Sequence, residues 1–186
     1  VLAGVPADEN VNCQSIPPAA TVLATDNCDA SVQVVFSENI TPGACADDYL
    51  VVRVWTATDA CGNAATASQT ITVTDDEAPI LAGIPADVAG DCDQIPVVPP
   101  AGSVTATDNC DVDVNIVFNE TEVAGACLGS KVVTRTWVAT DNCGNQTVES
   151  QVISVGDAQP PVLAGVPADE NVNCQSIPPA ATVLAT

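Results

Sequence analysis

The sequence predicts an all-β protein built from repeated β-sandwich units, and three observations support this prediction. Short runs of alternating apolar and polar residues recur along the chain, turn-forming residues separate them, and no segment has a convincing helical period. The octapeptide that opens the chain, VLAGVPAD (1–8), returns as ILAGIPAD (80–87) and as VLAGVPAD (162–169). Each complete unit also contains four cysteines, which is typical of small domains whose cores need covalent support.

The repeats divide the chain into three successive units. Residues 1–79 form the first unit, residues 80–161 the second, and residues 162–186 the beginning of a third. We refer to the first two as repeat 1 and repeat 2. Residues 162–186 are identical to residues 1–25, so a period of 161 residues is superimposed on the shorter one of about 80. Because the third unit stops early, we expect the sequence to be an excerpt from a longer tandem array.

Five to seven strands fit in a unit of this length, and five of them can be placed in repeat 1; the sequence does not decide whether short D or E strands lie between Asn39 and Ala46. A short run, TVLAT, predicts the second strand, and VQVVFS predicts the third, because Val32, Val34 and Phe36 would share one face. The long β-branched run YLVVRVWTAT predicts the fourth. In QTITVT, which predicts the fifth, Ile71 and Val73 alternate with threonines. The expected strands, labelled A, B, C, F and G as in a trimmed immunoglobulin-like sandwich, cover residues 2–12, 21–26, 31–38, 48–58 and 66–74.

Repeat 2 has the same alternating pattern. Val114, Ile116 and Phe118 correspond to the third strand, and Ile153 and Val155 to the last. Two antiparallel sheets packed face to face are the usual fold for short alternating strands at this spacing. The predicted fold class is therefore a series of immunoglobulin-like β-sandwich modules.

The charge composition excludes several classes of function. The chain has 24 acidic residues against 3 basic ones, which gives a net charge of −21. Such a surface does not attract nucleic acid or anionic membranes, since both require lysine and arginine. No apolar run approaches the roughly 20 residues of a membrane-spanning helix. The absence of histidine rules out Ser–His–Asp and Cys–His catalysis, and we expect no enzymatic activity.

The cysteines indicate disulfides formed in an oxidising, extracellular compartment. They lie at positions 13, 28, 45, 61, 92, 110, 127, 143 and 174. A repeating, even number per small unit is typical of a disulfide framework. A zinc site is the weaker interpretation, because the sequence contains neither a CxxC pair nor a histidine.

The sandwich topology suggests which cysteines lie near each other. Cys28 and Cys61 each end an ATDxC motif that follows a strand (ATDNC and ATDAC), and those two strands end at the same pole. Cys13 and Cys45 would share the opposite pole. Pairing neighbours within a unit predicts four disulfides, with Cys174 bonded to a cysteine beyond residue 186: Cys13–Cys45, Cys28–Cys61, Cys92–Cys127 and Cys110–Cys143.

The acidic residues between the two repeats suggest a cation site. The link TDDEAP (74–79) should arrive near the two ATDxC loops of the next repeat. Calcium prefers clustered carboxylate and carbonyl oxygens, so it is the one candidate cofactor. The alternative is that these residues only form turns, for which aspartate and asparagine are well suited. The candidate ligands are Asp75, Asp76, Glu77, Asp108, Asp111 and Asp141.

Two further patterns have a functional and a structural interpretation. Three sequons, at Asn39, Asn119 and Asn145, match the N-glycosylation motif, which matters only in a eukaryotic host. Arg53 and Trp55 would share a strand face. Their pairing favours a tryptophan core anchor beside an arginine that finds a carboxylate, rather than a cation–π ligand patch.

The motifs TATDNCD, RTWVATDNCGN and ITVTDDEAPILAGIPADV resemble hyalin-repeat-like modules of giant secreted cell-surface proteins of Bacteroidetes, which include gliding-motility adhesins exported by the type IX system. The resemblance covers the whole chain and implies an immunoglobulin-like extracellular domain used for adhesion or as a stalk. We therefore expect a structural, adhesive module of a long extracellular fibre.

The alternative function is a lectin-like, carbohydrate-binding module of a surface protein. The expected partners of the chain are neighbouring repeats of the same chain. Two further candidates are a second chain that associates laterally into a filament, through exposed edge strands, and a surface polysaccharide.

Overall fold

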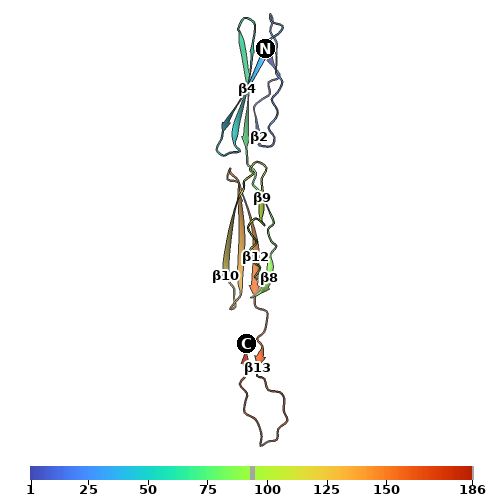
Figure 1. The fold of residues 1–186 in the computed structure, drawn as a ribbon, viewed down its shortest axis with the longest axis vertical. Coiled ribbons are helices and arrows are strands. Elements are labelled where there is room, and N and C mark those ends of the chain that lie inside the picture. Colours follow the sequence, from blue (N-terminus) through green and yellow to red (C-terminus); the bar gives the residue numbers. More distant parts are fainter. Residues whose placement is uncertain (93–94, 186) are drawn as a thin grey trace.

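The structure is an elongated stack of β-sheet repeats. The computed structural model describes residues 1–92 and 95–185. Figure 1 shows repeat 1 and repeat 2 placed end to end along the long axis, with the chain from residue 162 continuing beyond repeat 2. The regular elements of the described residues are strands, which confirms the all-β prediction. Within this part of the chain, no helix is long and apolar enough to cross a membrane.

Repeat 1 contains two sheets of different size. The larger sheet has the order β2-β6-β5-β4, in which β2 runs parallel to β6 and the other pairs are antiparallel. The smaller sheet pairs β1 with β3. The six strands are β1 (Leu2–Ala3), β2 (Glu9–Asn12), β3 (Leu23–Ala24), β4 (Gln33–Pro42), β5 (Tyr49–Thr58) and β6 (Ala64–Thr74).

The first predicted strand, residues 2–12, is two strands that belong to different sheets. The chain leaves the smaller sheet after Ala3 and joins the larger one at Glu9. Gly4 adopts a φ of 87°, a conformation that favours glycine, and Pro6 has no N–H with which to continue a ladder. These residues explain why the strand cannot run straight through.

The third predicted strand is longer than expected. The sequence predicts residues 31–38, whereas β4 remains paired with β5 until Pro42 opposite Tyr49. The β4–β5 hairpin therefore reaches the pole of the repeat, and the tight turn that closes it contains Cys45.

Repeat 2 has the same topology as repeat 1. Its larger sheet has the order β10-β11-β12-β8, and its smaller sheet pairs β7 with β9. Beyond repeat 2, β13 (Leu163–Ala164) pairs with β14 (Leu184–Ala185) in the register of β1 and β3. The strands of repeat 2 are β7 (Ile80–Ala82), β8 (Val88–Asp91), β9 (Thr105–Thr107), β10 (Asn115–Ala124), β11 (Lys131–Thr140) and β12 (Gln146–Gly156).

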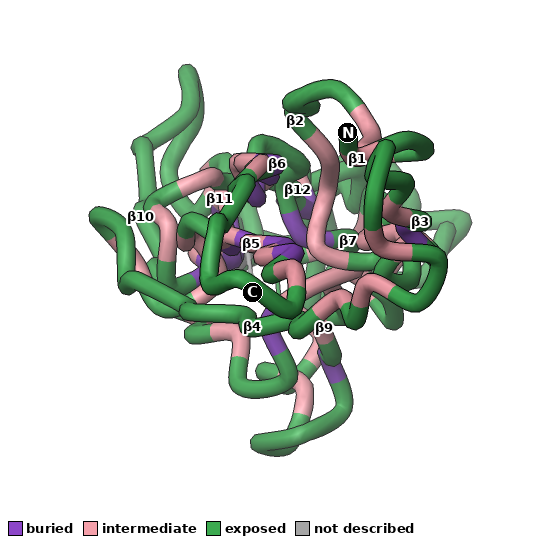
Figure 2. Tube along the Cα trace, turned by 90° about the horizontal axis from the view of Figure 1, so that it is seen from above, coloured by how far each residue is buried: buried purple, intermediate pink, exposed green. Residues whose placement is uncertain are grey.

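Each repeat has a small core. In repeat 1, Val51, Ile71 and Val73 form one buried cluster. Trp55 is buried farther along β5, and the centroid of its indole lies 5.5 Å from that of the Phe36 ring. Seen along the stack in Figure 2, the buried residues lie toward the middle and most of the outer surface is exposed. A core of this size gives each repeat limited stability of its own.

Two buried polar side chains hold the edges of the sandwich together. Arg53 Nε bonds Glu38 Oε2 at 2.8 Å, and its Nη2 donates to the Pro17 carbonyl at 2.8 Å. Gln69 Nε2 donates to the Ala7 carbonyl at 3.0 Å, which fixes the VPAD segment against β6. The structure thus supports the core interpretation of Arg53, with Glu38 as the carboxylate partner.

Candidate functional site: the junction between repeats

The aspartate of each ATDxC loop orients the cysteine that follows it. In repeat 2, Asp108 Oδ1 accepts a hydrogen bond from the Cys110 amide at 2.8 Å. Asp141 Oδ1 accepts one from the Cys143 amide at 2.9 Å. The equivalent bonds in repeat 1, both 2.9 Å, join Asp26 to Cys28 and Asp59 to Cys61. The turn-forming role of these aspartates is therefore present in all four loops.

Hydrogen bonds within the loops of repeat 1 lower the pKa values of their aspartates. The backbone N–H of Cys28 is the main reason that the pKa of Asp26 lies below its usual value. The Asn63 side chain contributes most to the lowered pKa of Asp59. Both carboxylates are thus held in the ionised form that accepts these hydrogen bonds.

A second aspartate ties the two loops of each pole together. Asp111 Oδ2 accepts a hydrogen bond from the Asn142 amide at 2.9 Å. In repeat 1, Asp29 Oδ2 accepts one from the Ala60 amide at 3.1 Å. The two cysteines of a pole are consequently presented together on one small platform.

The cysteines at this platform bond across the junction to repeat 1. Cys13 and Cys110 form a disulfide with a Cα–Cα distance of 5.9 Å, and Cys45 and Cys143 form another at 5.0 Å. Both distances are in the normal range for disulfides. Figure 1 shows that the two repeats meet end to end. Two covalent bonds, in addition to the backbone, therefore connect consecutive repeats.

The predicted pairing within repeats is wrong. Cys13–Cys45 and Cys110–Cys143 are replaced by the two bonds across the junction. Cys28, Cys61, Cys92 and Cys127 are exposed thiols in the structure, so Cys28–Cys61 and Cys92–Cys127 are not formed either. Cys174 is also an exposed thiol. The cysteines lie at the predicted poles, but the bonded cysteines pair with those of the adjacent repeat and not with the other cysteine of their own pole.

Side chains around the first disulfide connect the repeats further. Asn109 Nδ2 donates to Asn12 Oδ1 at 3.0 Å, and Gln14 Nε2 donates to the Asn109 carbonyl at 2.8 Å. Sequence reasoning missed Asn12 and Gln14 as junction residues. Their position on either side of Cys13 is the signal that identifies them once the cysteine is known to bond across the junction.

Hydrogen bonds between the repeats also surround the second disulfide, Cys45–Cys143. Asn142 Nδ2 donates to Asp47 Oδ2 at 2.6 Å. Asn145 Nδ2 donates to the Asp75 carbonyl at 3.0 Å and to Asp141 Oδ2 at 2.9 Å. The junction thus combines two disulfides with hydrogen bonds from both loops of repeat 2.

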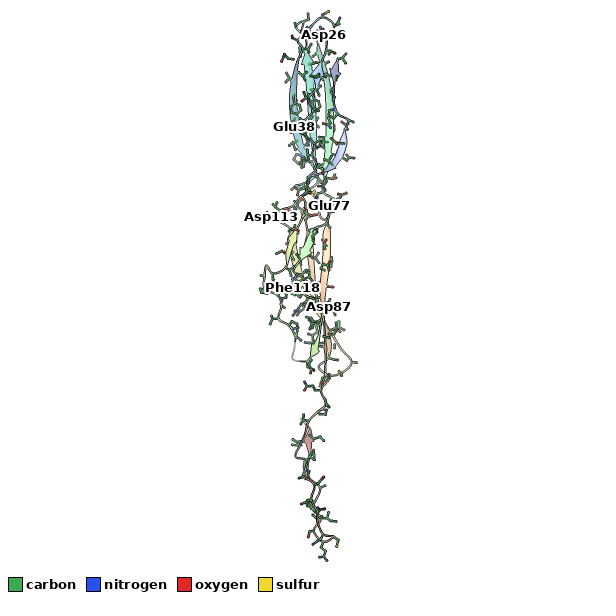
Figure 3. The ribbon with its side chains drawn as sticks, turned by 90° about the vertical axis from the view of Figure 1, so that its right-hand side faces the viewer. Asp26, Glu38, Glu77, Asp87, Asp113 and Phe118 are labelled. Atoms are coloured by element: carbon green, nitrogen blue, oxygen red, sulfur yellow. A yellow bond between two sulfur atoms is a disulfide. The ribbon has the colours of Figure 1, made fainter. Side chains whose placement is uncertain are left out.

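The acidic residues predicted as calcium ligands fall into three groups. Asp75 is buried, with 6% of its surface exposed, and its Oδ2 has no hydrogen-bond partner. Oxygens of Asp75 and Asp108 lie within 4.8 Å of each other. Asp76 and Glu77 are exposed, and Figure 3 places Glu77 beside the junction. Asp111 and Asp141 use carboxylate oxygens to bind backbone amides.

Burial and neighbouring negative charges both raise the pKa of Asp75. Desolvation, followed by the negative charge of Asp108, raises the pKa of Asp75 above its usual value. Asp141 and Asp47 add smaller contributions of the same sign. The ionised form of Asp75 is therefore unfavourable at this position unless a cation balances its charge.

The three sequon asparagines differ in accessibility. Asn39 lies on β4 and Asn119 on β10, and both are exposed. Asn145 lies at the junction, where its side-chain nitrogen donates both hydrogen bonds described above. Attachment of a glycan to Asn145 would remove one of these donors.

One groove lies on the body of repeat 2, away from the ATDxC loops. It has a volume of about 490 Å³, and its lining includes Val104, Val114, Phe118 and Trp137. Trp55 and Trp137 are both buried core residues. The aromatic residues that a lectin-like site would use are therefore in the sheets and not at the ATDxC loops, where the alternative function would need them.

A known protein family has the same number of cysteines per domain as each repeat of this chain. Residues 2–73 match a protein family described as an HYR-like domain with 4 cysteines. Repeat 1 is therefore similar to HYR-like domains. No curated protein sequence matches the chain significantly.

Several solved structures are similar at low sequence identity. Protocadherin Gamma B2 extracellular cadherin domains 1–5 are 16% identical over 86% of this chain and 40% of that chain, with a TM-score of 0.34. Drosophila N-cadherin EC1–4 is 12% identical over 81% of this chain and 48% of that one, with a TM-score of 0.31. The chain thus spans less than half the length of either cadherin chain.

Proposed function

We propose that this HYR-like chain is a structural and adhesive module of a long extracellular fibre. The observation that carries the proposal is the pair of disulfides between repeat 1 and repeat 2. Disulfides persist in oxidising compartments, which supports a location outside the cell or on its surface. The charge of −21 favours an extended, soluble array, because like charges along the fibre repel one another.

The junction geometry supports a stiff connection. A single backbone link allows one repeat to bend and twist against the next, as short inter-domain linkers usually do. Here the two disulfides and the backbone provide three covalent connections at separate points of the interface. Pro79, which is fully buried at the end of the link, further restricts the backbone.

Small-angle X-ray scattering tests this function. We expect the oxidised chain to scatter as one rod-like population, and a Cys110→Ser/Cys143→Ser variant to show a broader distribution of overall dimensions. The matched control is Cys28→Ser/Cys61→Ser, which removes two equivalent cysteines from the free pole and should leave the scattering unchanged. Identical scattering from the junction variant and the control contradicts a stiffening role.

We also propose that chains associate side by side through the exposed edges of their larger sheets. The strands β4 and β10 are the outer strands of the larger sheets, and both contain exposed apolar residues such as Val35 and Val117. An open edge of this kind can pair with a strand of a second chain. Electron microscopy of the assembled material distinguishes single beaded threads from thicker filaments.

We also propose a calcium ion at the junction, with Asp75 and Asp108 as its carboxylate ligands. Asn109 Oδ1, like Asp75 Oδ2, is a buried oxygen without a hydrogen-bond partner. Unpaired buried oxygens are costly, and a divalent cation that takes oxygen ligands would relieve this cost. This site uses two of the six predicted ligands.

Calorimetric titration with calcium chloride tests the cation site. We expect binding to the wild-type chain and loss of binding in Asp75→Asn, which keeps the shape of the side chain but removes its charge. Asp76→Asn is the control, since Asp76 is an exposed neighbour. Equal heats of binding for the two variants would place any calcium elsewhere on this acidic protein.

A further inference from the structure

We propose that repeat 2 forms two more inter-repeat disulfides, with a repeat-1-like unit that follows it in the same chain. In this arrangement Cys92 bonds the counterpart of Cys28, and Cys127 bonds the counterpart of Cys61. The inference rests on the proposed fibre function and extends it to a continuous ladder of disulfides.

The number of cysteines fits such a ladder. The closed junction takes the first and third cysteines of repeat 1 and the second and fourth cysteines of repeat 2. Four exposed thiols remain in the two repeats: Cys28 and Cys61 at one pole, and Cys92 and Cys127 at the other. With four cysteines per repeat and two bonds per junction, every cysteine of an extended array has one partner.

The free pole of repeat 1, which carries Cys28 and Cys61, already has the loop geometry of the disulfide-bonded pole of repeat 2. Asp59 Oδ1 accepts hydrogen bonds from the Cys61 amide at 2.9 Å and the Asn63 amide at 2.8 Å. The counterpart Asp141 binds the amides of Cys143 and Asn145 at 2.9 and 2.8 Å. The frame that presents the cysteine is therefore the same before and after bond formation.

The opposite pole of repeat 2 is preformed in the same way. The turn around Cys127 closes through a bond from the Gly125 amide to the Ser130 carbonyl at 2.8 Å. The turn around bonded Cys45 closes through the equivalent Gly43–Asp48 bond at 2.7 Å. Figure 1 shows this pole of repeat 2 facing the next segment of the chain.

Cys92 also occupies the position that Cys13 has in repeat 1. It directly follows β8, as Cys13 follows β2, and its sulfur lies 3.7 Å from the Gly156 carbonyl at the end of β12. Partial desolvation and the charges of Asp157 and Asp91 raise the pKa of the Cys92 thiol. The thiol form therefore persists at neutral pH, and oxidation depends on a partner cysteine held close to it.

One pair of residues differs between the closed junction and the proposed one, and this difference indicates that the unit after repeat 2 resembles repeat 1. The closed junction contains the hydrogen bond between Asp47 and Asn142. Counting from the neighbouring cysteines, Gly129 takes the place of Asp47, and Ala60 takes the place of Asn142. If a repeat-1-like pole faces repeat 2, neither the acceptor nor the donor of this hydrogen bond is present, so neither is left without its partner. Residues 162–186, identical to residues 1–25, are the beginning of such a unit.

The chemistry of each new bond is an ordinary thiol oxidation. Two cysteine thiols lose two protons and two electrons and form one S–S bond. Thiol–disulfide exchange with glutathione disulfide accepts the electrons and releases two molecules of glutathione. No other reactant is required.

Disulfide mapping of a lengthened chain tests the proposal. Residues 1–161 are followed by a second copy of residues 1–79, so the sequence of residues 1–186 is retained apart from Cys28→Ser/Cys61→Ser in the first unit, and repeat 2 occurs once. These substitutions make the third-unit peptides that contain the counterparts of Cys28 and Cys61 unique. After oxidation with glutathione disulfide, non-reduced digests should link Cys92 and Cys127 to the third unit, in addition to Cys13–Cys110 and Cys45–Cys143.

The outcomes separate this inference from the proposed function. Finding Cys92–Cys127, or alkylation of both thiols, beside intact Cys13–Cys110 and Cys45–Cys143 overturns only the ladder. Loss of Cys13–Cys110 and Cys45–Cys143 as well contradicts the closed junction on which the proposed function depends. A control chain with serine at the two third-unit positions should leave Cys92 and Cys127 open to alkylation.

An isotope experiment tests whether the unit comes from the same chain. Unlabelled and ¹⁵N-labelled copies of the lengthened chain are mixed, reduced and oxidised together. We expect at least ten times more linked peptides of a single isotope composition than of mixed composition. A statistical mixture of labelled and unlabelled halves would assign the bonds to separate chains and overturn the in-chain arrangement.

Discussion

At the scale of single residues, the aspartate of each ATDxC loop holds the amide of the cysteine and thereby directs its side chain. Replacing Asp141 by alanine removes hydrogen bonds to the Cys143 and Asn145 amides at a closed junction. We expect this change to lower the free energy of unfolding by about 1–3 kcal/mol, the usual cost of unpaired buried donors. Thermal or denaturant unfolding of the oxidised protein measures it.

The repeated loops provide a control for this prediction. Asp59→Ala removes the same two bonds at the free pole, where the loop is exposed and water can replace them. We therefore expect a smaller loss for Asp59→Ala than for Asp141→Ala. Equal losses would show that the junction adds nothing to the importance of the aspartate.

The raised pKa of Asp75, also a property of a single residue, predicts that the stability of the protein depends on pH. Because its pKa is raised in the folded protein, the folded state binds a proton more tightly than the unfolded state does. The contribution of Asp75 to stability is therefore most favourable below its unfolded pKa of about 3.8 and is lost as the pH rises through the folded value. At pH 7, without calcium, the ionised carboxylate destabilises the junction.

The variant Asp75→Asn tests this sign. In the presence of a chelator we expect its melting temperature to exceed that of the wild type at pH 7, by about 2–4 °C per kcal/mol for a chain of this size. The difference should shrink as the pH approaches 4. Asp76→Asn, at an exposed position, should show no such trend, and a wild type that is more stable than Asp75→Asn at pH 7 in chelator contradicts the interpretation.

At the scale of elements, the parallel strand β2 depends on a side chain from its neighbour. Gln69 is buried on β6 and donates to the Ala7 carbonyl and to Glu9 Oε1 at 3.0 and 3.1 Å. Gln69→Leu leaves the carbonyl unpaired, and we expect a loss of about 1–3 kcal/mol. Hydrogen exchange should be faster in β2 than in β5, whereas Gln33→Leu, at an exposed position of β4, should leave exchange in β2 unchanged.

The strands themselves were largely predictable, and the exceptions have local causes. The period-two runs correctly predicted β5 and β6, because alternate side chains of these strands are buried, and they located β4, although it extends to Pro42 and is mostly exposed. The division of residues 2–12 into β1 and β2 was missed. Apolar periodicity carries no information about which sheet a strand joins, and the turn at Gly4 and Pro6 decides this.

At the scale of the whole molecule, sequence reasoning placed the cysteines at the correct poles but paired them wrongly. It considered only the three connectivities available within one repeat. In a stack, the pole that carries Cys13 and Cys45 faces the pole that carries Cys110 and Cys143. The decisive information is the order of the repeats in space, which a single unit does not contain.

The crossed disulfides also limit how far the molecule can be stretched. Residues 13 and 143 are connected by two short routes: residues 13–45 and then the Cys45–Cys143 bond, or the Cys13–Cys110 bond and then residues 110–143. Each route contains 32 or 33 residue steps, whereas the backbone between the two positions contains 130. Either disulfide alone is therefore sufficient to keep the intervening chain from extending.

Single-molecule force spectroscopy can test this redundancy. At about 3.4 Å per extended residue, the double variant Cys110→Ser/Cys143→Ser should lengthen by about 330 Å more than the wild type when fully unfolded. Each single variant should unfold to nearly the wild-type length, because the remaining disulfide still bypasses most of the chain. Cys28→Ser/Cys61→Ser should match the wild type. If either single variant gains the full 330 Å, the two bonds do not act as parallel connections, and the fibre depends on each of them separately.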